Sequence, residues 1–241
     1  MPSIYKKTDD TTYALGKTLV FELLKFSPKQ CTCVYISDKT KKDESFAEIE
    51  RLCKENNIGI CLSNKIFNKL SDKENCYVIA EFKKWNGKID VNGNHIVLVN
   101  PANTGNLGTI MRAALGFGIY DIALIGSSVD EFDPKTIRAS MGSIFSLNIE
   151  HFNEYSDYSK KVSENRNIYP FMLKATTNLK NVVVDNNKKW SLIFGNESTG
   201  LDDSFLKIGE PLIIKHTKNI DSLNVSVSVA IALFYFTDFK N

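Results

Sequence analysis

Three short clusters after residue 99 combine glycines with polar side chains of types that suit ligand binding. The first spans residues 100–112 and ends in Arg112, the second spans residues 194–200 around Glu197, and the third spans residues 214–224. Glycine lets the backbone approach a ligand closely, and a loop that leads into a helix can present N–H groups to it. Each cluster alone is weak evidence, so the elements that position them matter.

All three clusters follow predicted strands. Short apolar runs predict strands at residues 95–99, 121–125, 169–173, 191–194 and 211–214. Helices are predicted between them, at residues 107–117 and 134–141. The apolar segment from Leu223 fits both a strand and a helix pattern at residues 224–229, and its length favours a helix. Strands separated by helices indicate a parallel sheet, in which ligands bind at the carboxyl ends of the strands.

The first third of the chain also alternates helix and strand patterns, which predicts a small α/β sandwich. Residues 11–26 carry leucines at helical spacing and are predicted as one amphipathic helix. Strands are expected at residues 31–36, 58–62 and 77–82, and helices at 43–56 and 64–70. The turn-rich stretch 83–94 predicts a linker, so the domains are expected at residues 1–90 and 91–241.

The composition is that of a globular protein. The chain has 241 residues, of which 43% are hydrophobic and 24% charged, which excludes disordered and collagenous classes. The net charge of +2 does not by itself indicate nucleic-acid binding. No run is long enough to span a membrane and none resembles a signal peptide, so a cytoplasmic location is expected. The five cysteines are expected to be reduced core thiols, and neither they nor the three histidines show metal-site spacing.

Together and in this order, the three clusters resemble the TrmH/SpoU branch of the SPOUT methyltransferases. The family motifs read approximately N-x-G-x-x-x-R, G-x-E-x-x-G, and I-P-M followed by S-L-N-V-S-V-A, and the match covers residues 95–237. The resemblance implies methylation of a ribose 2′-hydroxyl in rRNA, or otherwise tRNA, with S-adenosylmethionine as methyl donor. It also implies a parallel sheet with helices on both faces, a C-terminal trefoil knot and a homodimer.

The resemblance also assigns site residues. The implied active-site group consists of Asn106, Arg112, Ser222 and Asn224. The implied cofactor contacts come from the second and third clusters, at Gly195, Asn196, Glu197, Gly200, Ile214 and Leu223. Because a guanidinium resists deprotonation, Arg112 is expected to anchor a phosphate and stabilise the developing alkoxide, with Asn106 and Ser222 holding the hydroxyl. No metal is expected.

Simpler interpretations stand beside these roles. Asn106, Ser222 and Asn224 are residue types that cap helices, and Arg112 could form a surface ion pair. Lys215 and His216 replace the usual Pro and Met of the third motif, which motivates the alternative of an RNA-binding protein with impaired catalysis. A nucleotide-binding α/β protein unrelated to methylation is a third possibility.

The N-terminal region resembles, by order of elements alone, a small ribosomal-protein-like RNA-binding domain. Lys6, Lys7 and Lys17 are the candidate phosphate contacts there, although a solvated lysine face would explain them equally. The sequence does not indicate which RNA or nucleotide is modified, where the proton goes, or whether the role is housekeeping or antibiotic resistance.

Overall fold

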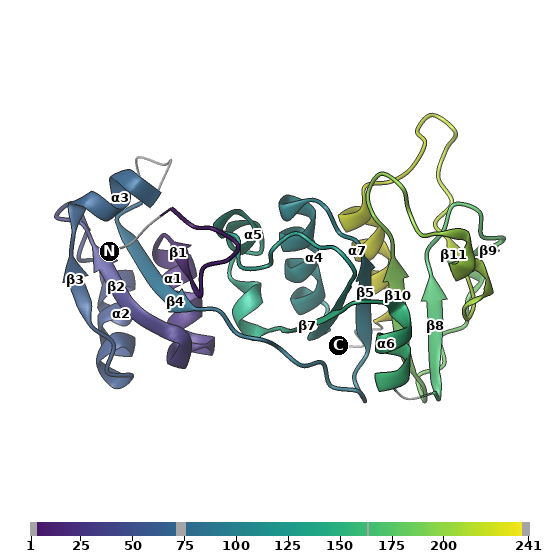
Figure 1. The fold of residues 1–241 in the computed structure, drawn as a ribbon, viewed down its shortest axis with the longest axis horizontal. Helices are drawn as coiled ribbons and strands as arrows, with labels where there is room; N and C mark the ends of the chain where they lie inside the picture. The colour runs from purple at the N-terminus through teal and green to yellow at the C-terminus, as the bar shows by residue number, and fades with distance from the viewer. Residues whose placement is uncertain (1–3, 71–75, 163, 238–241) are drawn as a thin grey trace. The chain divides into compact units, whose positions relative to one another are not determined.

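Two sheets organise the chain, each in a compact unit of its own (Figure 1). The computed structural model describes residues 4–70, 76–162 and 164–237. The N-terminal unit consists of Met1–Trp85 with Asp130–Ser146, and the C-terminal unit consists of Asn86–Val129 with Leu147–Asn241. The predicted division at residue 90 differs from this one, because it placed residues 130–146 in the second domain.

The N-terminal unit is built on a mixed four-stranded sheet in the order β1-β4-β2-β3. Strand β4 pairs antiparallel with both β1 and β2, whereas β3 runs parallel to β2. The strands are β1 (Thr11–Leu15), β2 (Cys31–Ile36), β3 (Ile60–Leu62) and β4 (Val78–Lys83). The helices are α1 (Lys17–Phe26), α2 (Glu44–Glu55) and α3 (Asn64–Leu70), so the predicted alternation of helix and strand is confirmed.

The prediction of one helix over residues 11–26 is wrong. Residues 11–15 form β1, and the helix begins only at Lys17. Gly16 separates the two with a φ of 100°, a left-handed value that non-glycine residues rarely adopt. Pairing with β4 buries Tyr13 and Ala14, and this tertiary contact outweighs the helical spacing of the leucines.

Residues 130–146 belong to the N-terminal unit because of what they bury. They contain α5 (Pro134–Ala139) and a 3₁₀ turn (Ser143–Ser146). The rings of Phe132 and Phe145 pack against Phe82, with centroids 6.4 and 5.4 Å away. The Thr12 hydroxyl donates a hydrogen bond of 2.7 Å to the Phe132 carbonyl oxygen. Apolar burial and this bond fix the segment on β1 and β4.

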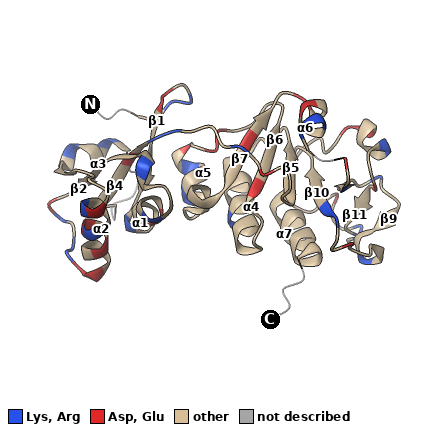
Figure 2. Ribbon diagram, turned by 90° about the horizontal axis from the view of Figure 1, so that it is seen from below, with Lys and Arg blue, Asp and Glu red and all other residues tan. Residues whose placement is uncertain are grey.

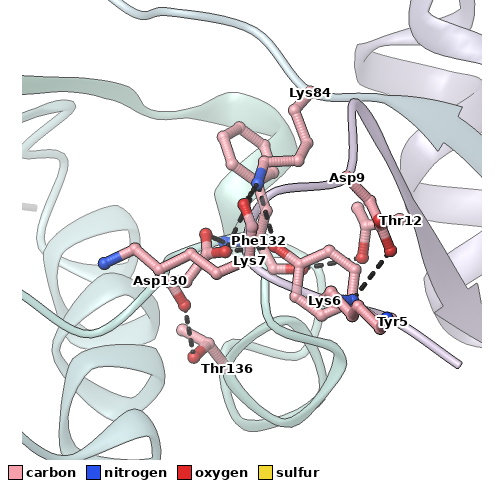
Figure 3. Close-up of polar contacts among 9 residues, drawn as sticks. All are labelled: Tyr5, Lys6, Lys7, Asp9, Thr12, Lys84, Asp130, Phe132 and Thr136. Atoms are coloured by element: carbon pink, nitrogen blue, oxygen red, sulfur yellow. Dashed lines mark hydrogen bonds and ion pairs between the residues drawn. The ribbon is translucent and has the colours of Figure 1, made fainter.

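A polar cluster adds to this attachment (Figure 3). The Tyr5 hydroxyl donates to the Asp130 carboxylate. The Lys84 ammonium group lies 3.0 Å from the Tyr5 hydroxyl oxygen and donates to the Lys7 carbonyl oxygen at 2.8 Å. Burial, together with the bond to Asp130, raises the pKa of Tyr5 well above its ordinary value. Tyr5 therefore stays a neutral donor that ties the N-terminal segment to the start of α5.

The five cysteines, all among the described residues, form no disulfide bond, and they do not share one environment. Cys31, Cys53 and Cys76 are buried, as expected for core thiols. Cys61 is exposed, which makes the core prediction wrong at this position, because it faces outward on the short strand β3. Its sulfur lies 3.4 Å from that of the half-buried Cys33.

The C-terminal unit is built on a five-stranded sheet in the order β7-β6-β5-β10-β8, and every pairing is parallel. This confirms the predicted parallel sheet. The strands are β5 (His95–Val99), β6 (Asp121–Ile125), β7 (Asn148–Phe152), β8 (Arg166–Pro170) and β10 (Lys189–Phe194). A small second sheet pairs β9 (Thr177–Asn178) with β11 (Leu212–Ile213).

Helices cover both faces of the five-stranded sheet (Figure 2). On one face lie α4 (Thr104–Gly116) and α7 (Val225–Phe236), which pack against each other. The ring of Phe236 on α7 packs on Tyr169 and Trp190, at 4.8 and 5.5 Å. On the other face lies α6 (Tyr155–Lys161), where buried Tyr158 joins the cluster that includes Val97 and Ile193. The segment after Leu223 is therefore a helix, as its apolar length favoured.

A buried polar cluster occupies the amino ends of the central strands. The Arg166 guanidinium donates to the His95 ring nitrogen and to the Ser191 hydroxyl, both at 2.8 Å. The other His95 ring nitrogen lies 2.7 Å from the Asp90 carbonyl oxygen. Burial, and secondarily the Arg166 charge, lowers the pKa of His95 to about 4. His95 is therefore a neutral structural histidine at the end of the sheet away from the strands' carboxyl ends.

In the part of the chain that the structure describes, no helix is both long and apolar enough to cross a bilayer.

Candidate functional site

A cavity of about 530 Å³ opens at the carboxyl ends of β8, β10 and β11. Its size falls within the range of about 300–1,000 Å³ that is usual for small-molecule sites. The wall includes all six residues predicted to contact the cofactor, which are Gly195, Asn196, Glu197, Gly200, Ile214 and Leu223. Ser222 also lines the cavity. Chain segments that are far apart in sequence thus meet where the parallel-sheet rule placed a ligand.

Gly195 is required by the close packing of the loop that follows β10. A Cβ atom at this position would lie 2.2 Å from the Gly200 carbonyl carbon and 2.3 Å from the Leu201 nitrogen. These are backbone atoms, so a side chain would displace the loop itself. Asn196 holds the same turn, because its side-chain oxygen accepts from the Ser198 nitrogen at 2.8 Å. The loop can therefore present backbone groups to the cavity at a fixed position.

Glu197 lines the cavity, but its carboxylate is bound to the start of α4. It accepts hydrogen bonds from the backbone nitrogens of Ala102 and Asn103, at 3.0 and 3.2 Å, and from the Asn106 side chain at 3.1 Å. Partial burial raises the pKa of Glu197, but these hydrogen bonds outweigh burial and hold it below its ordinary value. The carboxylate is thus a fixed anion that joins the second cluster to the first.

Asn106 and Asn224 extend this connection to the third cluster. The Asn224 side-chain nitrogen donates to the Asn106 side-chain oxygen at 3.0 Å. The Asn224 oxygen accepts from the Ser226 backbone nitrogen at 2.8 Å and so caps α7. Asn106 does not cap α4, because Asn103 is the N-cap residue there. One hydrogen-bonded chain, Glu197–Asn106–Asn224, therefore links all three motifs.

Arg112 and Ser222 complete the implied active-site group without joining this chain. Arg112 is exposed on α4, and within residues 4–70, 76–162 and 164–237 its guanidinium has no hydrogen bond or ion pair. The surface ion pair considered as its simpler role is absent there. Ser222 is exposed and lines the cavity. Both side chains are accessible to a substrate.

The sequence reasoning missed part of the cavity wall. Residues 171–174, which follow β8, and residues 201–203 also line it. Phe171 stacks on Phe194 with ring centroids 4.5 Å apart, and Lys174 pairs with Asp203 at 2.7 Å. A strand was predicted at residues 169–173. The rule that ligands bind at the carboxyl ends of parallel strands would therefore have pointed to residues 171–174 as part of the wall.

Lys215 and His216, which depart from the family motif, differ in exposure. His216 lines the cavity, and its Nδ1 atom lies 3.0 Å from the Ile214 carbonyl oxygen. Lys215 lies between them and is exposed. The contact between His216 and Ile214 restrains the loop in which Pro and Met are usual.

The lysines predicted to contact RNA have other contacts in the N-terminal unit. The Lys17 ammonium group pairs with Asp43 at 2.7 Å and donates to the Lys41 carbonyl oxygen at 3.0 Å. Lys6 forms a turn through its backbone, which donates to the Asp9 carboxylate at 2.8 Å. The Lys7 carbonyl oxygen accepts from Lys84. Their role toward RNA stays a prediction.

Comparison with known proteins agrees with this architecture. The model of the SpoU rRNA Methylase family matches residues 93–234. A relative is the 23S rRNA (guanosine(2553)-2′-O)-methyltransferase RlmP of Bacillus subtilis strain 168, with 26% identity over 95% of this chain and 90% of that protein.

Two solved structures share the fold. An AdoMet-bound rRNA methyltransferase from Sinorhizobium meliloti has a TM-score of 0.81 and 21% identity, over 94% of this chain and 87% of that one. The SpoU methyltransferase AviRb of Streptomyces viridochromogenes, in complex with AdoMet, has a TM-score of 0.80 and 16% identity, over 95% and 89%.

The chain combines a parallel sheet with a cavity that its second and third motifs line. The chain belongs to the SpoU rRNA Methylase family. It is an RNA 2′-O-methyltransferase, as the motif resemblance implied. Among the residues described, no group of three or more His, Cys, Asp or Glu side chains could hold a metal ion.

We expect Glu197→Gln to lower the rate of methyl transfer by about tenfold or more. The amide keeps the shape but loses the charge that three donors share, and each weakened charge-assisted hydrogen bond costs roughly 1–3 kcal/mol. Steady-state kinetics would measure the loss as a lower kcat. The control is Asp203→Asn, which removes an exposed carboxylate from the same cavity. A normal kcat for Glu197→Gln would show that the Glu197 charge is not needed to position Asn106.

Proposed function

We propose that this protein transfers a methyl group from S-adenosylmethionine to a ribose 2′-hydroxyl of ribosomal RNA, with transfer RNA as the second candidate substrate. The observation that carries the proposal is the hydrogen-bonded chain Glu197–Asn106–Asn224, which joins three motifs beside one cavity. Family membership and the 2′-O-methyltransferase relative support it. An RNA substrate of this kind supports a cytoplasmic location.

The cavity fits S-adenosylmethionine. Its volume of about 530 Å³ suits a nucleoside-sized ligand, and Phe171, Leu212 and Leu223 supply apolar wall. The glycine loop at residues 195–200 brings backbone polar groups to the cavity. Among the described lining residues there is no arginine, and the one lysine, Lys174, is paired with Asp203. When bound, the cofactor supplies an electrophilic methyl carbon.

The protein's own residues then position the ribose. A ribose hydroxyl is a weak nucleophile, so the contribution of this chain would be to hold the 2′-oxygen in line with the methyl group of the bound cofactor. We assign Asn106 and Ser222 to holding the hydroxyl. The Arg112 guanidinium, which has no partner among the described residues, is assigned to the RNA phosphate and to the developing negative charge on the oxygen.

We infer that the C-terminal segment forms the trefoil knot that the family resemblance implies. Strand β10 follows β8 in sequence but lies between β8 and β5 in the sheet. After β10 the chain continues along the loop at residues 195–200 and along β11. Helix α7 then packs on α4 and β10. This return path supports threading, although knots are rare among folds.

We expect the protein to be a homodimer through α7. Val227, Ile231 and Phe234 recur at helical spacing and are exposed, with Phe234 at 75%. Of the other aromatic residues on α7, Phe236 is buried, and the Tyr235 hydroxyl donates to the Val182 carbonyl oxygen. The sequence has a further aromatic residue, Phe239, which lies outside the described residues.

Light scattering tests the dimer. We expect about twice the chain mass of 27.1 kDa for the unaltered protein and the chain mass itself for Phe234→Glu, because a charge on the apolar stripe opposes association. Leu62→Glu on β3, an equally exposed apolar position, is the control and should remain a dimer. A 27.1 kDa particle for the unaltered chain at micromolar concentration would contradict the proposal.

The alternative of an RNA-binding protein with impaired catalysis rests on the Lys215–His216 departure. Mapping of 2′-O-methyl groups in total RNA, with and without the gene, distinguishes the two. The proposed function predicts at least one methyl group that disappears on deletion and returns with the unaltered gene. Identical methylation maps would favour the alternative.

A further inference from the structure

A second cavity, also of about 530 Å³, lies wholly within the N-terminal unit. Its wall comes from the end of β1 and the start of α1, from the last residues of α3, and from α5. It has no part in the site at the carboxyl ends of β8 and β10. Helix α5 belongs to the segment that separates β6 from β7 in sequence but packs with the N-terminal unit.

Most of the charged side chains around this cavity are cationic. The basic residues in the wall are Lys17, Lys69, Lys135 and Arg138, and the acidic residue is Asp133. Figure 2 marks basic residues on α1, α3 and α5. In a chain with a net charge of only +2, four basic side chains against one carboxylate among the described wall residues are a local excess that favours an anionic ligand.

Two of these cations are not neutralised within the described chain. Lys17 pairs with Asp43, so part of its charge is already compensated. Lys135 and Arg138 are both exposed on α5, and neither side chain has an ion pair or hydrogen bond among residues 4–70, 76–162 and 164–237. Their spacing of three positions places them on the same side of the helix. These two side chains are therefore available to a ligand.

The backbone adds donors to the same wall. Helix α1 begins after Gly16, which offers no side-chain cap, and the next three residues line the cavity. First-turn N–H groups of a helix lack intrahelical partners and carry partial positive charge. The only carboxylate in the described wall, Asp133, accepts from the Lys135 backbone nitrogen at 2.7 Å as the N-cap of α5. The basic side chains and the start of α1 therefore both favour an anionic ligand in this cavity.

We propose that this cavity binds the phosphate backbone of the substrate RNA, with Lys135 and Arg138 as its principal contacts. The inference rests on the proposed function, which supplies the phosphodiester. It moves the expected RNA contacts from Lys6 and Lys7, which do not line the cavity, to α5. Backbone charge contacts of this kind supply affinity and position without reading the base sequence.

The test measures binding of the full chain to total ribosomal RNA as a function of salt concentration. Lys135→Gln with Arg138→Gln removes two charges and keeps most of both stems. The matched control, Lys29→Gln with Lys54→Gln, removes two exposed charges of the same unit outside the cavity. We expect the cavity variant to bind about tenfold more weakly, with a salt slope smaller by roughly 1.4 to 2, and the control to change little.

Turnover separates this inference from the proposed function. The cavity variant should raise the KM for RNA and leave kcat and the affinity for S-adenosylhomocysteine unchanged. Equal weakening in both double variants, or unchanged binding in the cavity variant, would overturn the inference. Absence of methyl transfer by the unaltered protein would contradict the proposed function, and the binding comparison would still decide the inference.

Discussion

Arg112→Ala should lower the turnover number by a factor on the order of 10² or more, the scale for loss of a preorganised electrostatic group. Arg112 is exposed on α4 and has no ion pair among the described residues, so its removal disturbs no bond of the fold that the structure shows. Its contribution should therefore appear in the transition state. The affinity for S-adenosylhomocysteine should barely change, because Arg112 does not line the cofactor cavity.

Arg112→Lys sharpens this prediction. Lysine keeps the charge but lacks the planar fork of donors, so we expect it to be nearly as inactive as alanine. The control is Arg51→Ala on α2, an exposed arginine paired with Glu48 and Glu55 outside both cavities. Transfer from labelled S-adenosylmethionine is measured beside cofactor binding. Near-normal turnover of Arg112→Ala would refute the catalytic role, and loss of cofactor affinity alone would move Arg112 to the cofactor site.

Gly195→Val should weaken cofactor binding by about 100-fold. A Cβ atom at Gly195 would lie 2.2 Å from a backbone carbon of Gly200, so the loop that lines the cavity must move. Overpacking costs roughly 1–3 kcal/mol, and a clash with backbone lies at the upper end. The structure therefore predicts a displaced loop within an otherwise intact sheet.

Titration calorimetry with S-adenosylhomocysteine measures this effect. Gly116→Val at the end of α4 is the matched control, because a Cβ atom there meets nothing within 4 Å. Circular dichroism shows whether both variants keep their secondary structure. Unchanged affinity in a folded Gly195→Val protein would exclude this cavity as the cofactor site.

Much of the parallel sheet was predictable from local pattern. The strands at residues 95–99 and 121–125 have the predicted bounds, because buried central strands are continuous apolar runs. Strand β7 was missed because it lies at an edge and only Ile149 of its five residues is buried. A strand with one buried side chain carries too little hydrophobic signal to be recognised.

Other errors came from tertiary contacts. Residues 130–146 follow β6 in sequence, but Phe132 and Phe145 pack on Phe82, so the segment joins the N-terminal unit. Local periodicity does not report such long-range packing. For the same reason the amphipathic pattern of residues 11–26 concealed β1, whose pairing partner lies far along the chain.

The candidate site shows the same division between motif and packing. The three motifs and their resemblance to the family identified the predicted side chains around the cavity. They did not show that the Glu197 carboxylate binds the backbone of Ala102 and Asn103. That role depends on how the loop after β10 meets the start of α4, which only the folded chain determines.

The most direct test of the central claim is nucleoside analysis after methyl transfer by the purified protein. Total RNA from a strain that lacks the gene is incubated with the protein and methyl-labelled S-adenosylmethionine, and is then digested to nucleosides. We predict label in a 2′-O-methylribose nucleoside, lost when Asn106 is replaced by alanine. Label on a base, or no label in RNA that the protein binds, would contradict the account.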